Sequence, residues 1–530
     1  MGLTSAVGGR LLLPLISCLL ASGVVYVIGA IIYRLYFHPL SKFPGPFWAK
    51  ISNLYGGYHA WKGDLHVDMW RCHEQYGDYV RYAPNRLMIN TNTGLKDIYS
   101  YSKSFQKSEV YHAMVHRAPN TLTCVDKKKH GRKRRIISQG FSDSALRGFE
   151  NTILTHIRKL CNQVEADVAP QKMDSKSAPW SEGQNMGKWS NYLTFDIMSD
   201  VIFGESYALL EKPDNRFVIK AIEDSNIRTS VLVQAAEIGF RRLDRYLFPE
   251  AIIARNKFIS FVSGLLKERM AAKPIKRPDV FSFLLDAKDP ETQQGLGMAE
   301  IGAESTTMIV AGSDTTSTAI ASSFFYLMHN PECYQKAAAE VRSVFASHED
   351  VHLGPALNSC VYLRACIDES MRMSPPAAVA PWREVLEGGV TIDGHFIPRG
   401  CDVGTSIYAI HHNAAYYPEP FTFSPERWCV EPPAGSLKAP SVVLAQSAFN
   451  PFSIGPRGCV GKGLANTELM LTMATMLSRF DIKLADGPEG IIGCGNSDAE
   501  YGRHRVNEYQ LDDHITAAKN GPIVQFRSRA

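Results

Sequence analysis

The chain has 530 residues, enough for several small domains or for one enzyme-sized unit. With 45% hydrophobic and 21% charged residues, its composition is that of a globular protein and excludes a fibrous or wholly disordered chain. The 57 basic and 53 acidic residues leave a net charge of +4, which gives no general case for binding nucleic acid. The 11 cysteines are odd in number and irregularly spaced, which favours a reducing compartment over a disulfide-linked secreted fold.

Residues 11–32 form an uncharged, strongly apolar segment near the N-terminus. At roughly 1.5 Å per residue a helix of this length spans about 33 Å, enough to cross a hydrocarbon core of about 30 Å. A cleaved signal peptide is the alternative, but its apolar part is usually only about 7–15 residues long and is followed by small residues. Here the aromatic and basic stretch YRLYFHPL follows, so the sequence predicts an uncleaved membrane anchor within residues 1–34.

Basic residues are more numerous after this segment than before it: Arg10 precedes it, and Arg34, His38, Lys42 and Lys50 follow. The positive-inside bias therefore predicts a cytosolic body and a lumenal N-terminus. Residues 35–50 include the stretch HPLSKFPGP, which cannot continue a helix and is predicted to be a stiff hinge that turns the body toward the membrane. We see no linker that would divide residues 51–530, which we expect to form one large domain.

Helices dominate the pattern that follows. Residues 186–203 and 251–271 show helical spacing of apolar side chains, and residues 299–329 run without proline up to the Asn330–Pro331 break. Short strand-like segments occur at 79–90 and 389–397. The predicted fold class is mainly α with small β-sheets (α+β).

The strongest local signal is Cys459, which lies in the glycine-rich loop FNPFSIGPRGCVGKG just before a predicted helix. Backbone N–H groups and the dipole at a helix N-terminus favour thiolate over thiol, and glycines let a large flat ligand approach the backbone. A buried structural cysteine, a covalent nucleophile and a metal ligand all fit such a position. The residues alone leave the last two open, because a nucleophile needs a base that the sequence cannot place.

The longer string Phe452-x-x-Gly455-x-Arg457-x-Cys459-x-Gly461 resembles the haem-binding signature of the cytochrome P-450 superfamily. AGSDTT (311–316) resembles its oxygen-activation motif, ESMR (369–372) its Glu-x-x-Arg motif, and FSPERW (423–428) the segment that comes next. The order and separation of the four strings agree over roughly residues 40–530. The resemblance implies the cytochrome P-450 fold with a single N-terminal transmembrane helix, and a haem-binding catalytic domain at 51–530.

By this resemblance Cys459 is the axial ligand of haem b iron, where a thiolate pushes electron density onto the metal and favours O–O cleavage. Phe452 and Gly461 belong to the same cofactor-binding loop. The side chains implied to reach the haem propionates are Arg457, His130, Arg134 and Arg383. Arginine suits this role because its planar fork binds a carboxylate bidentately. His130 and Arg134, four residues apart, would share one helix face.

The AGSDTT motif implies a catalytic pair. Ala311 and Gly312 leave room for haem and oxygen, and Asp314 and Thr315 are implied to relay protons. A threonine that merely bonds back to a preceding carbonyl is the alternative for Thr315.

The Glu-x-x-Arg motif implies a structural element rather than chemistry. Glu369, Arg372 and Arg427 are expected to form a buried triad that serves folding and haem incorporation.

The segment KKKHGRKRR (127–135) is strongly basic, and a solvated basic face is the simplest interpretation. The resemblance assigns His130 and Arg134 to haem. We predict that the other basic residues form a docking surface for an acidic flavoprotein reductase, which salt would weaken: Lys127, Lys128, Lys129, Arg132, Lys133 and Arg135.

The function implied is that of a monomeric, endoplasmic-reticulum-anchored oxidoreductase that acts on paired donors and incorporates molecular oxygen. Electrons would come from NADPH through a separate NADPH–cytochrome P-450 reductase, with cytochrome b5 as an alternative donor. The substrate would be an apolar small molecule. The strings look most like filamentous-fungal microsomal members, many of which tailor polyketides, terpenoids, alkaloids or peptides.

Two other classes remain open. One is an enzyme of the same family with a different outcome: an isomerase or dehydratase, a desaturase or a ring-coupling enzyme. The other is a non-catalytic haem-binding membrane protein. The intact acid–threonine pair argues against the isomerase and the non-catalytic protein. Specificity is expected to lie in residues 105–125, 205–250 and Ala377–Pro381, which the motifs do not cover.

Overall fold

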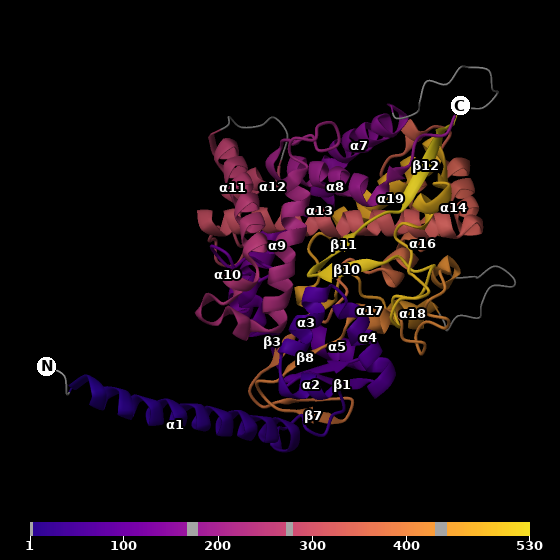
Figure 1. Ribbon diagram of the computed structural model, residues 1–530. Coiled ribbons are helices and arrows are strands. Elements are labelled where there is room, and N and C mark those ends of the chain that lie inside the picture. Colours follow the sequence, from indigo (N-terminus) through magenta and orange to yellow (C-terminus); the bar gives the residue numbers. More distant parts are fainter. Residues whose placement is uncertain (1–3, 167–178, 272–278, 430–441, 530) are drawn as a thin grey trace.

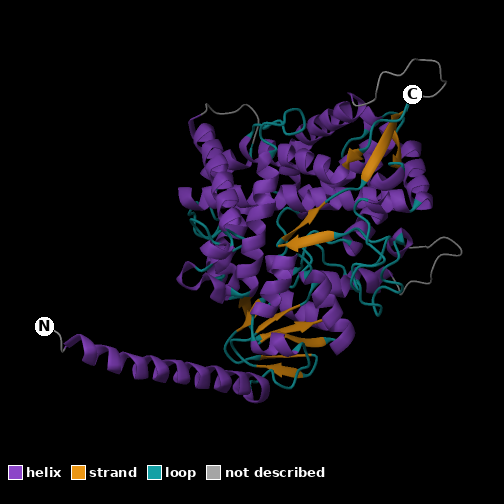
Figure 2. Ribbon diagram, viewed as in Figure 1, coloured by secondary structure: helices purple, strands orange, loops and turns teal. Residues whose placement is uncertain are grey.

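The computed structural model describes residues 4–166, 179–271, 279–429 and 442–529. Within these ranges the chain is mainly helical with small sheets, as the sequence predicted (Figures 1 and 2). The helices are α1 Thr4–Ile32, α2 Phe47–Ile51, α3 Leu54–Lys62, α4 Leu65–Tyr76, α5 Asn92–Tyr99, α6 Lys127–Gln139, α7 Asp143–Ala166, α8 Met186–Phe203, α9 Phe217–Gln234, α10 Asp244–Leu247, α11 Pro249–Ala271, α12 Val280–Asp286, α13 Met298–His329, α14 Pro331–Val344, α15 Pro355–Asn358, α16 Val361–Met373, α17 Ile407–His411, α18 Val442–Ala448 and α19 Lys462–Arg479.

Strands and short turns complete the described chain. The strands are β1 Tyr79–Ala83, β2 Arg86–Ile89, β3 Phe105–Lys107, β4 Gln184–Asn185, β5 Arg383–Val385, β6 Val390–Ile392, β7 His395–Ile397, β8 Asp402–Gly404, β9 Phe480–Leu484, β10 Leu511–His514, β11 Thr516–Lys519 and β12 Ile523–Ser528. One five-stranded sheet has the order β1-β2-β8-β5-β3, and only the β2–β8 pair in it is parallel. The short helical turns include η2 Glu109–Met114, η3 Ala236–Arg242, η5 Pro425–Trp428 and η6 Gly455–Arg457.

The predicted elements agree with the structure apart from their ends. Residues 186–203 coincide with α8, and residues 251–271 fall in α11. The predicted helix 299–329 corresponds to α13, which begins one residue earlier, at Met298, and ends as predicted before Asn330–Pro331. The strand-like segment 79–90 is a hairpin, because the chain reverses at Pro84–Asn85 between β1 and β2. Residues 389–397 likewise form the hairpin β6–β7.

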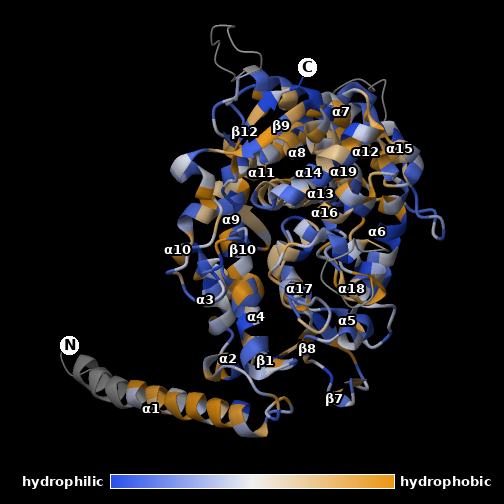
Figure 3. Ribbon diagram, turned by 90° about the vertical axis from the view of Figure 1, so that its right-hand side faces the viewer, coloured by the Kyte–Doolittle hydropathy of each residue, from blue (hydrophilic) through white to orange (hydrophobic). Residues whose placement is uncertain are grey.

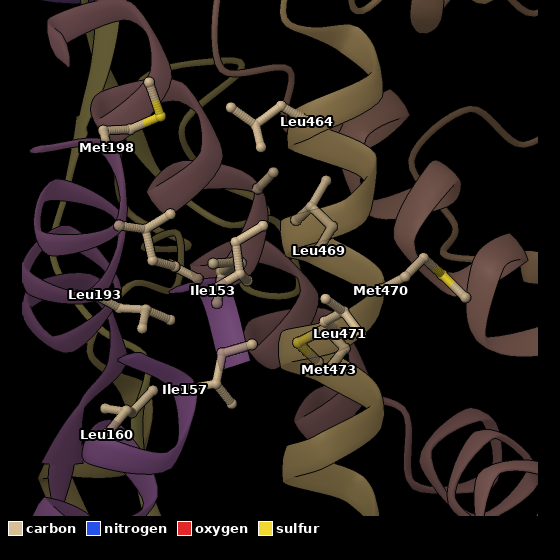
Figure 4. Close-up of a cluster of buried hydrophobic side chains, with 14 of the residues drawn as sticks. Ile153, Ile157, Leu160, Leu193, Met198, Leu464, Leu469, Met470, Leu471 and Met473 are labelled. Atoms are coloured by element: carbon tan, nitrogen blue, oxygen red, sulfur yellow. The ribbon is translucent and has the colours of Figure 1, made fainter. Parts of the chain in front are cut away.

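The main apolar core lies where α7, α8, α13 and α19 pack together. Figure 4 shows aliphatic side chains of α7 and α8 pointing toward those of α19, with Met470 on the opposite side of that helix. Leu464, Leu469 and Leu471 are at most 3% exposed. The helix that follows the Cys459 loop is therefore held on its inner face by close packing, which fixes the position of the loop.

The N-terminal helix projects away from the rest of the chain (Figures 1 and 3). Residues Ile16–Phe37 have a mean hydropathy of 2.2 and are long and apolar enough to cross a membrane. This agrees with the predicted anchor.

The hinge that follows packs on the body. The Arg81 guanidinium donates to the Arg34 carbonyl at 2.6 Å, and the Arg34 guanidinium donates to the Ile51 carbonyl at 2.6 Å. A Cβ at Gly45 would overlap the Arg81 carbonyl, so this turn needs a glycine.

A buried carboxylate joins α16 to the turn η5, as the Glu-x-x-Arg motif predicted. Glu369 accepts two hydrogen bonds of 2.9 Å from Arg372 and one of 3.1 Å from Arg427. The Trp428 indole N–H donates to the same carboxylate at 3.0 Å. Glu369 and Arg372 are 0% exposed and Arg427 is 2% exposed. One carboxylate therefore serves two buried guanidinium groups, whose other N–H groups donate to backbone carbonyls.

The charge balance sets the protonation of this triad. Burial by itself would raise the pKa of Glu369, but the charges and hydrogen bonds of Arg372 and Arg427 outweigh burial and hold the pKa below its usual range. A carboxylate with a depressed pKa stabilises the fold above the pKa of the unfolded chain, and its contribution is lost as the pH falls through the folded value.

We predict that Glu369→Gln lowers the free energy of unfolding by about 3–5 kcal/mol, because two buried guanidinium groups lose their counter-charge. Chemical denaturation followed by circular dichroism measures the change. The loss should shrink as the pH falls below the ordinary range of a glutamate.

The matched control is Glu349→Gln, which removes an ion pair of 2.7 Å with Arg158 whose side chains are 39% and 53% exposed. It should cost no more than about 1 kcal/mol. Equal costs at the two positions would contradict the compensating role of Glu369.

Candidate active site

A cavity of about 400 Å³ lies between α13 and the loop that carries Cys459. Each region predicted to determine specificity contributes to its lining: Tyr111 and Leu122 from 105–125, Val233 and Gln234 from 205–250, and most of Ala377–Pro381. The hairpin β10–β11 adds Ile515 and Thr516, which no motif indicated. The cavity is therefore assembled from segments that are far apart in the sequence.

The Cys459 thiol faces this cavity. Its backbone N–H donates to the Phe452 carbonyl at 2.9 Å, which closes the loop. Gly455 has φ +70°, and a Cβ there would overlap the Tyr99 carbonyl, so the turn before the cysteine requires glycine. Phe452, Arg457 and Gly461 line the same cavity.

The electrostatics of Cys459 differ in part from the sequence argument. Burial raises the pKa of the Cys459 thiol, while the backbone N–H groups of Gly461 and Lys462 and the charge of Arg134 lower it. The loop favours the thiolate as predicted, but burial outweighs it. A stable thiolate therefore needs a further positive partner within the cavity.

The surroundings distinguish the nucleophile from the metal ligand. Within the described residues no histidine or carboxylate hydrogen-bonds to Cys459, and the side chains whose charges lower its pKa are Arg134 and Lys462. The described residues also contain no group of three or more His, Cys, Asp or Glu that could hold a metal ion. A metal at Cys459 would need its other ligands from a cofactor.

Five basic side chains line the cavity: Lys107, His130, Arg134, Arg383 and Arg457. None has a carboxylate within ion-pair distance among the described residues. Arg457 donates to the carbonyls of Cys124 and Val125 at 2.5 and 2.9 Å, and Arg134 donates to the Gly458 carbonyl at 2.6 Å. Among the described residues, the positive charge of this cluster is met by backbone oxygens and by the rings of Tyr111 and Tyr99, which lie 4.4 Å from Lys107 and 5.0 Å from Arg383.

Burial and the mutual repulsion of these basic side chains lower the pKa values of several of them. Burial, together with Arg457 and Lys107, lowers the pKa of His130 to about 3, and burial with Arg383 lowers that of Arg457 to about 10. The same two causes lower the pKa of Lys107 well below its usual range. Such a cluster fits a ligand with carboxylates of its own.

These observations fit haem. The cavity offers one thiol for an axial bond and a separate cluster of cations for two propionates, and apolar side chains make up most of the remaining wall. Sequence reasoning missed Lys107, because a single lysine in the short strand β3 carries no local signal.

The AGSDTT segment lies in α13 on the cavity wall. Ala311 and Thr315 line the cavity. The Thr315 hydroxyl donates to the Ala311 carbonyl at 2.6 Å, so the backward hydrogen bond given as the alternative is present in a residue that also faces the cavity. Gly312 also lines it, and a Cβ there would meet the side chain of Met198 of α8, which would have to move.

Asp314, the other member of the implied proton relay, points away from the cavity. Its side chain is not part of the lining; instead its carboxylate accepts a short hydrogen bond from Thr516 and lies 3.8 Å from the Lys519 ammonium. Thr516 does line the cavity, so the carboxylate reaches the cavity through that hydroxyl.

The basic segment 127–135 forms α6, and His130 and Arg134 both line the cavity. The predicted docking surface is partly wrong. Lys133 is 3% exposed and its ammonium lies 2.7 Å from Glu300 and 3.5 Å from Glu304 of α13. A buried, paired lysine cannot meet a partner protein.

Two further members of the predicted surface are engaged within the chain. Arg132 bonds to Glu300 at 2.9 Å and Arg135 to Asp289 at 2.6 Å. Lys127, Lys128 and Lys129 are exposed, although Lys127 donates to two backbone carbonyls. Lys128 and Lys129 remain as exposed cations with no ion pair in the described chain.

Comparison with known proteins gives extensive matches. The family model for cytochrome P-450 matches residues 42–492. The chain is 52% identical over 514 residues to cytochrome P-450 monooxygenase AKT7 of Alternaria alternata, covering 97% of this chain and 98% of the relative. It is 49% identical over 511 residues to cytochrome P-450 monooxygenase atnE of Emericella nidulans, covering 96% of both.

A third relative is cytochrome P-450 monooxygenase poxM of Penicillium oxalicum, which is 46% identical over 504 residues, 95% of this chain and 93% of the relative. The family model spans the Cys459 loop and the AGSDTT and Glu-x-x-Arg segments. They show that the chain belongs to the cytochrome P-450 family, and is a monooxygenase with haem b as its cofactor.

Proposed function

We propose that in this monooxygenase Cys459 would hold haem iron through its thiolate, and that the enzyme oxidises an apolar small molecule with electrons from a separate reductase. One observation carries the proposal: the Cys459 thiol lines the same cavity as a cluster of basic side chains that have no carboxylate partner among the described residues. Arg457, Arg383, His130 and Arg134 would hold the propionates, with Lys107 as a fifth partner.

When bound, a thiolate-ligated haem supplies the reductive activation of molecular oxygen. The protein's part begins at Cys459, where the amides of Gly461 and Lys462 stabilise negative charge on sulfur. The Phe452 carbonyl fixes the backbone of the ligand by accepting its N–H. The apolar walls exclude water and so strengthen these interactions.

Proton supply would depend on α13 and the hairpin β10–β11. The Thr315 hydroxyl lies on the cavity wall, where it can pass a proton to a reacting oxygen. Asp314 would supply protons through the Thr516 hydroxyl, to which it is hydrogen-bonded. Lys519, which also donates to Asn191 at 2.7 Å and Ser317 at 2.8 Å, holds the carboxylate in place.

The relatives reported above come from filamentous fungi, and we infer a substrate from fungal secondary metabolism, derived from a polyketide, terpenoid, alkaloid or peptide. The mainly apolar lining supports an apolar molecule. Hydroxylation is the simplest outcome. The threonine on the cavity wall favours oxygen chemistry over isomerisation or dehydration.

We propose a single-pass protein of the endoplasmic reticulum with residues 1–34 as anchor, 35–50 as hinge and 51–530 as a cytosolic catalytic domain. Aromatic side chains support a membrane-facing surface near the anchor: Trp48 of α2 is 66% exposed and Tyr246 of α10 is 82% exposed. Both α1 and α10 lie toward the left of Figure 1. Aromatic rings of this kind favour the membrane–water interface.

The electron donor would be an NADPH–cytochrome P-450 reductase that docks by complementary charge. The exposed pair Lys128 and Lys129 on α6 supports this role, and the buried Lys133 does not take part. Lys127 lies beside the pair.

We predict that Cys459→Ser abolishes both turnover and the carbon monoxide difference spectrum of thiolate-ligated haem, because an alcohol is a poor axial donor. Cys429→Ser, at a half-buried thiol in the turn after the triad, is the control and should keep both. A normal spectrum in Cys459→Ser would contradict the assignment.

We predict that Thr315→Ala uncouples the enzyme. Product formed per NADPH should fall at least about ten-fold, since a positioned proton donor is typically worth about 10²–10⁴-fold in rate, while hydrogen peroxide rises. Thr306→Ala is the matched control, because Thr306 makes the same backward hydrogen bond, at 2.7 Å to Gly302, and does not line the cavity. Tight coupling in Thr315→Ala would refute the role.

We predict that neutralising Lys128 and Lys129 to Gln slows reduction by the reductase about three-fold or more at low salt, with a smaller effect at high salt. Stopped-flow reduction measures the rate. Lys220→Gln is the control, since this lysine is 78% exposed on α9, across the molecule from α6 in Figure 3. Equal rates in both variants would contradict docking at α6.

A further inference from the structure

The wall that α9 contributes to the cavity carries two polar side chains one helical turn apart. Ser230 and Gln234 line the cavity on either side of the apolar Val233, and each is only 2% exposed. Within the described chain, neither the Ser230 hydroxyl nor the Gln234 Nε2 atom donates a hydrogen bond. Because both residues line the cavity, this part of the wall offers two polar groups that a polar ligand atom could bind.

Arg86 of β2 fixes the orientation of the Gln234 amide. Its guanidinium donates to the Gln234 Oε1 atom at 3.0 Å, and also to the backbone carbonyls of Gln234 at 2.9 Å and Val233 at 3.1 Å. Because arginine only donates, the amide atom that faces it must be the oxygen. The NH2 group is therefore the end of the amide left for the cavity.

The positive charge of Arg86, which holds the Gln234 amide oxygen, is already compensated by other groups. The Arg86 guanidinium lies 3.5 Å from the Asp402 carboxylate and stacks on the Trp382 ring at 5.3 Å. Arg86 itself does not line the cavity, whereas Gln234 does. A ligand atom at this point thus meets an oriented neutral donor and no unpaired cation, which suits a carbonyl oxygen better than a carboxylate.

We propose that Gln234 is a specificity-determining residue that donates a hydrogen bond to a neutral carbonyl oxygen of the substrate, with Ser230 beside it and Arg86 as the positioning residue. The substrate class is an apolar molecule with a ketone, ester, lactone or amide carbonyl that docks against α9. This deepens the proposed function and rests on it, since the carbonyl would hold the molecule in the cavity that contains Cys459.

The test uses the full-length holoenzyme and three ten-carbon probes: decane, decan-2-one and decanoate. Dissociation constants are read from the haem difference spectrum, or by displacement of imidazole where a probe gives no spectral change. The quantity of interest is the ratio of the decane constant to the decan-2-one constant. In Gln234→Leu this ratio should fall about 3- to 10-fold, the effect of one buried hydrogen bond.

Gln234→Glu is the second variant, because it keeps a partner for Arg86 and replaces only the donor. It should lower the ratio as well, even if Gln234→Leu folds poorly. Val233→Ala is the matched control: it removes apolar contact from the same helix and should weaken both probes with the ratio unchanged within about two-fold.

Two results would overturn the proposal. One is an unchanged ratio in both Gln234 variants, which would mean that the amide does not recognise the carbonyl. The other is wild-type enzyme that binds decanoate at least about ten-fold more tightly than decan-2-one, which would indicate an anion site. The carbon monoxide spectrum of each variant reports separately on Cys459, so failure here is distinguishable from failure of the haem-thiolate assignment.

Discussion

Five basic side chains line the central cavity, and moving a cation out of water costs several kcal/mol unless an anion compensates it. In the described part of the chain these side chains have no ion pair, and their partners are backbone carbonyls such as those of Cys124, Val125 and Gly458 and the rings of Tyr99 and Tyr111. A cofactor with two carboxylates relieves the repulsion and adds binding energy that only the folded chain can gain. Folding and cofactor uptake are therefore thermodynamically linked.

The triad around Glu369 solves the same problem with the chain's own residues. There a single carboxylate meets two buried guanidinium groups, and the indole of Trp428 completes the hydrogen bonding. The contrast explains why one cluster can be a structural element while the other is a binding site. Both clusters bury arginine, but only one of them brings its own anion.

The sequence predicted contacts correctly where the interacting residues lie within one short motif. The residues of the Cys459 loop and of the Glu-x-x-Arg motif fall into place because their spacing fixes their geometry. Lys107, Thr516 and Gln234 could not be found in this way, since each depends on where a distant strand or helix packs. The displacement of Asp314 toward the hairpin β10–β11 is of the same kind, because its partner is some 200 residues away.

Lys133 was predicted to be exposed but is buried, although the helical spacing of its neighbours in the sequence already indicated an inward position. Residues His130, Lys133, Arg134 and Ile137 are spaced i, i+3, i+4 and i+7, which places all four on one face of α6. The rule that brought His130 and Arg134 to the cavity therefore also turns Lys133 inward, toward Glu304. Composition alone described the segment as a charged surface, while periodicity divides it into an inner and an outer face.

Two hydrogen bonds hold the segment just after α1 against the body. Arg34 donates to the Ile51 carbonyl at the end of α2, and Arg81 of β1 donates to the Arg34 carbonyl. These bonds restrict how far the helix can move independently of the body. Tilting the helix would tilt the catalytic body with it, so the thickness of the surrounding bilayer, through its effect on helix tilt, could set the angle at which the enzyme presents itself to its partners.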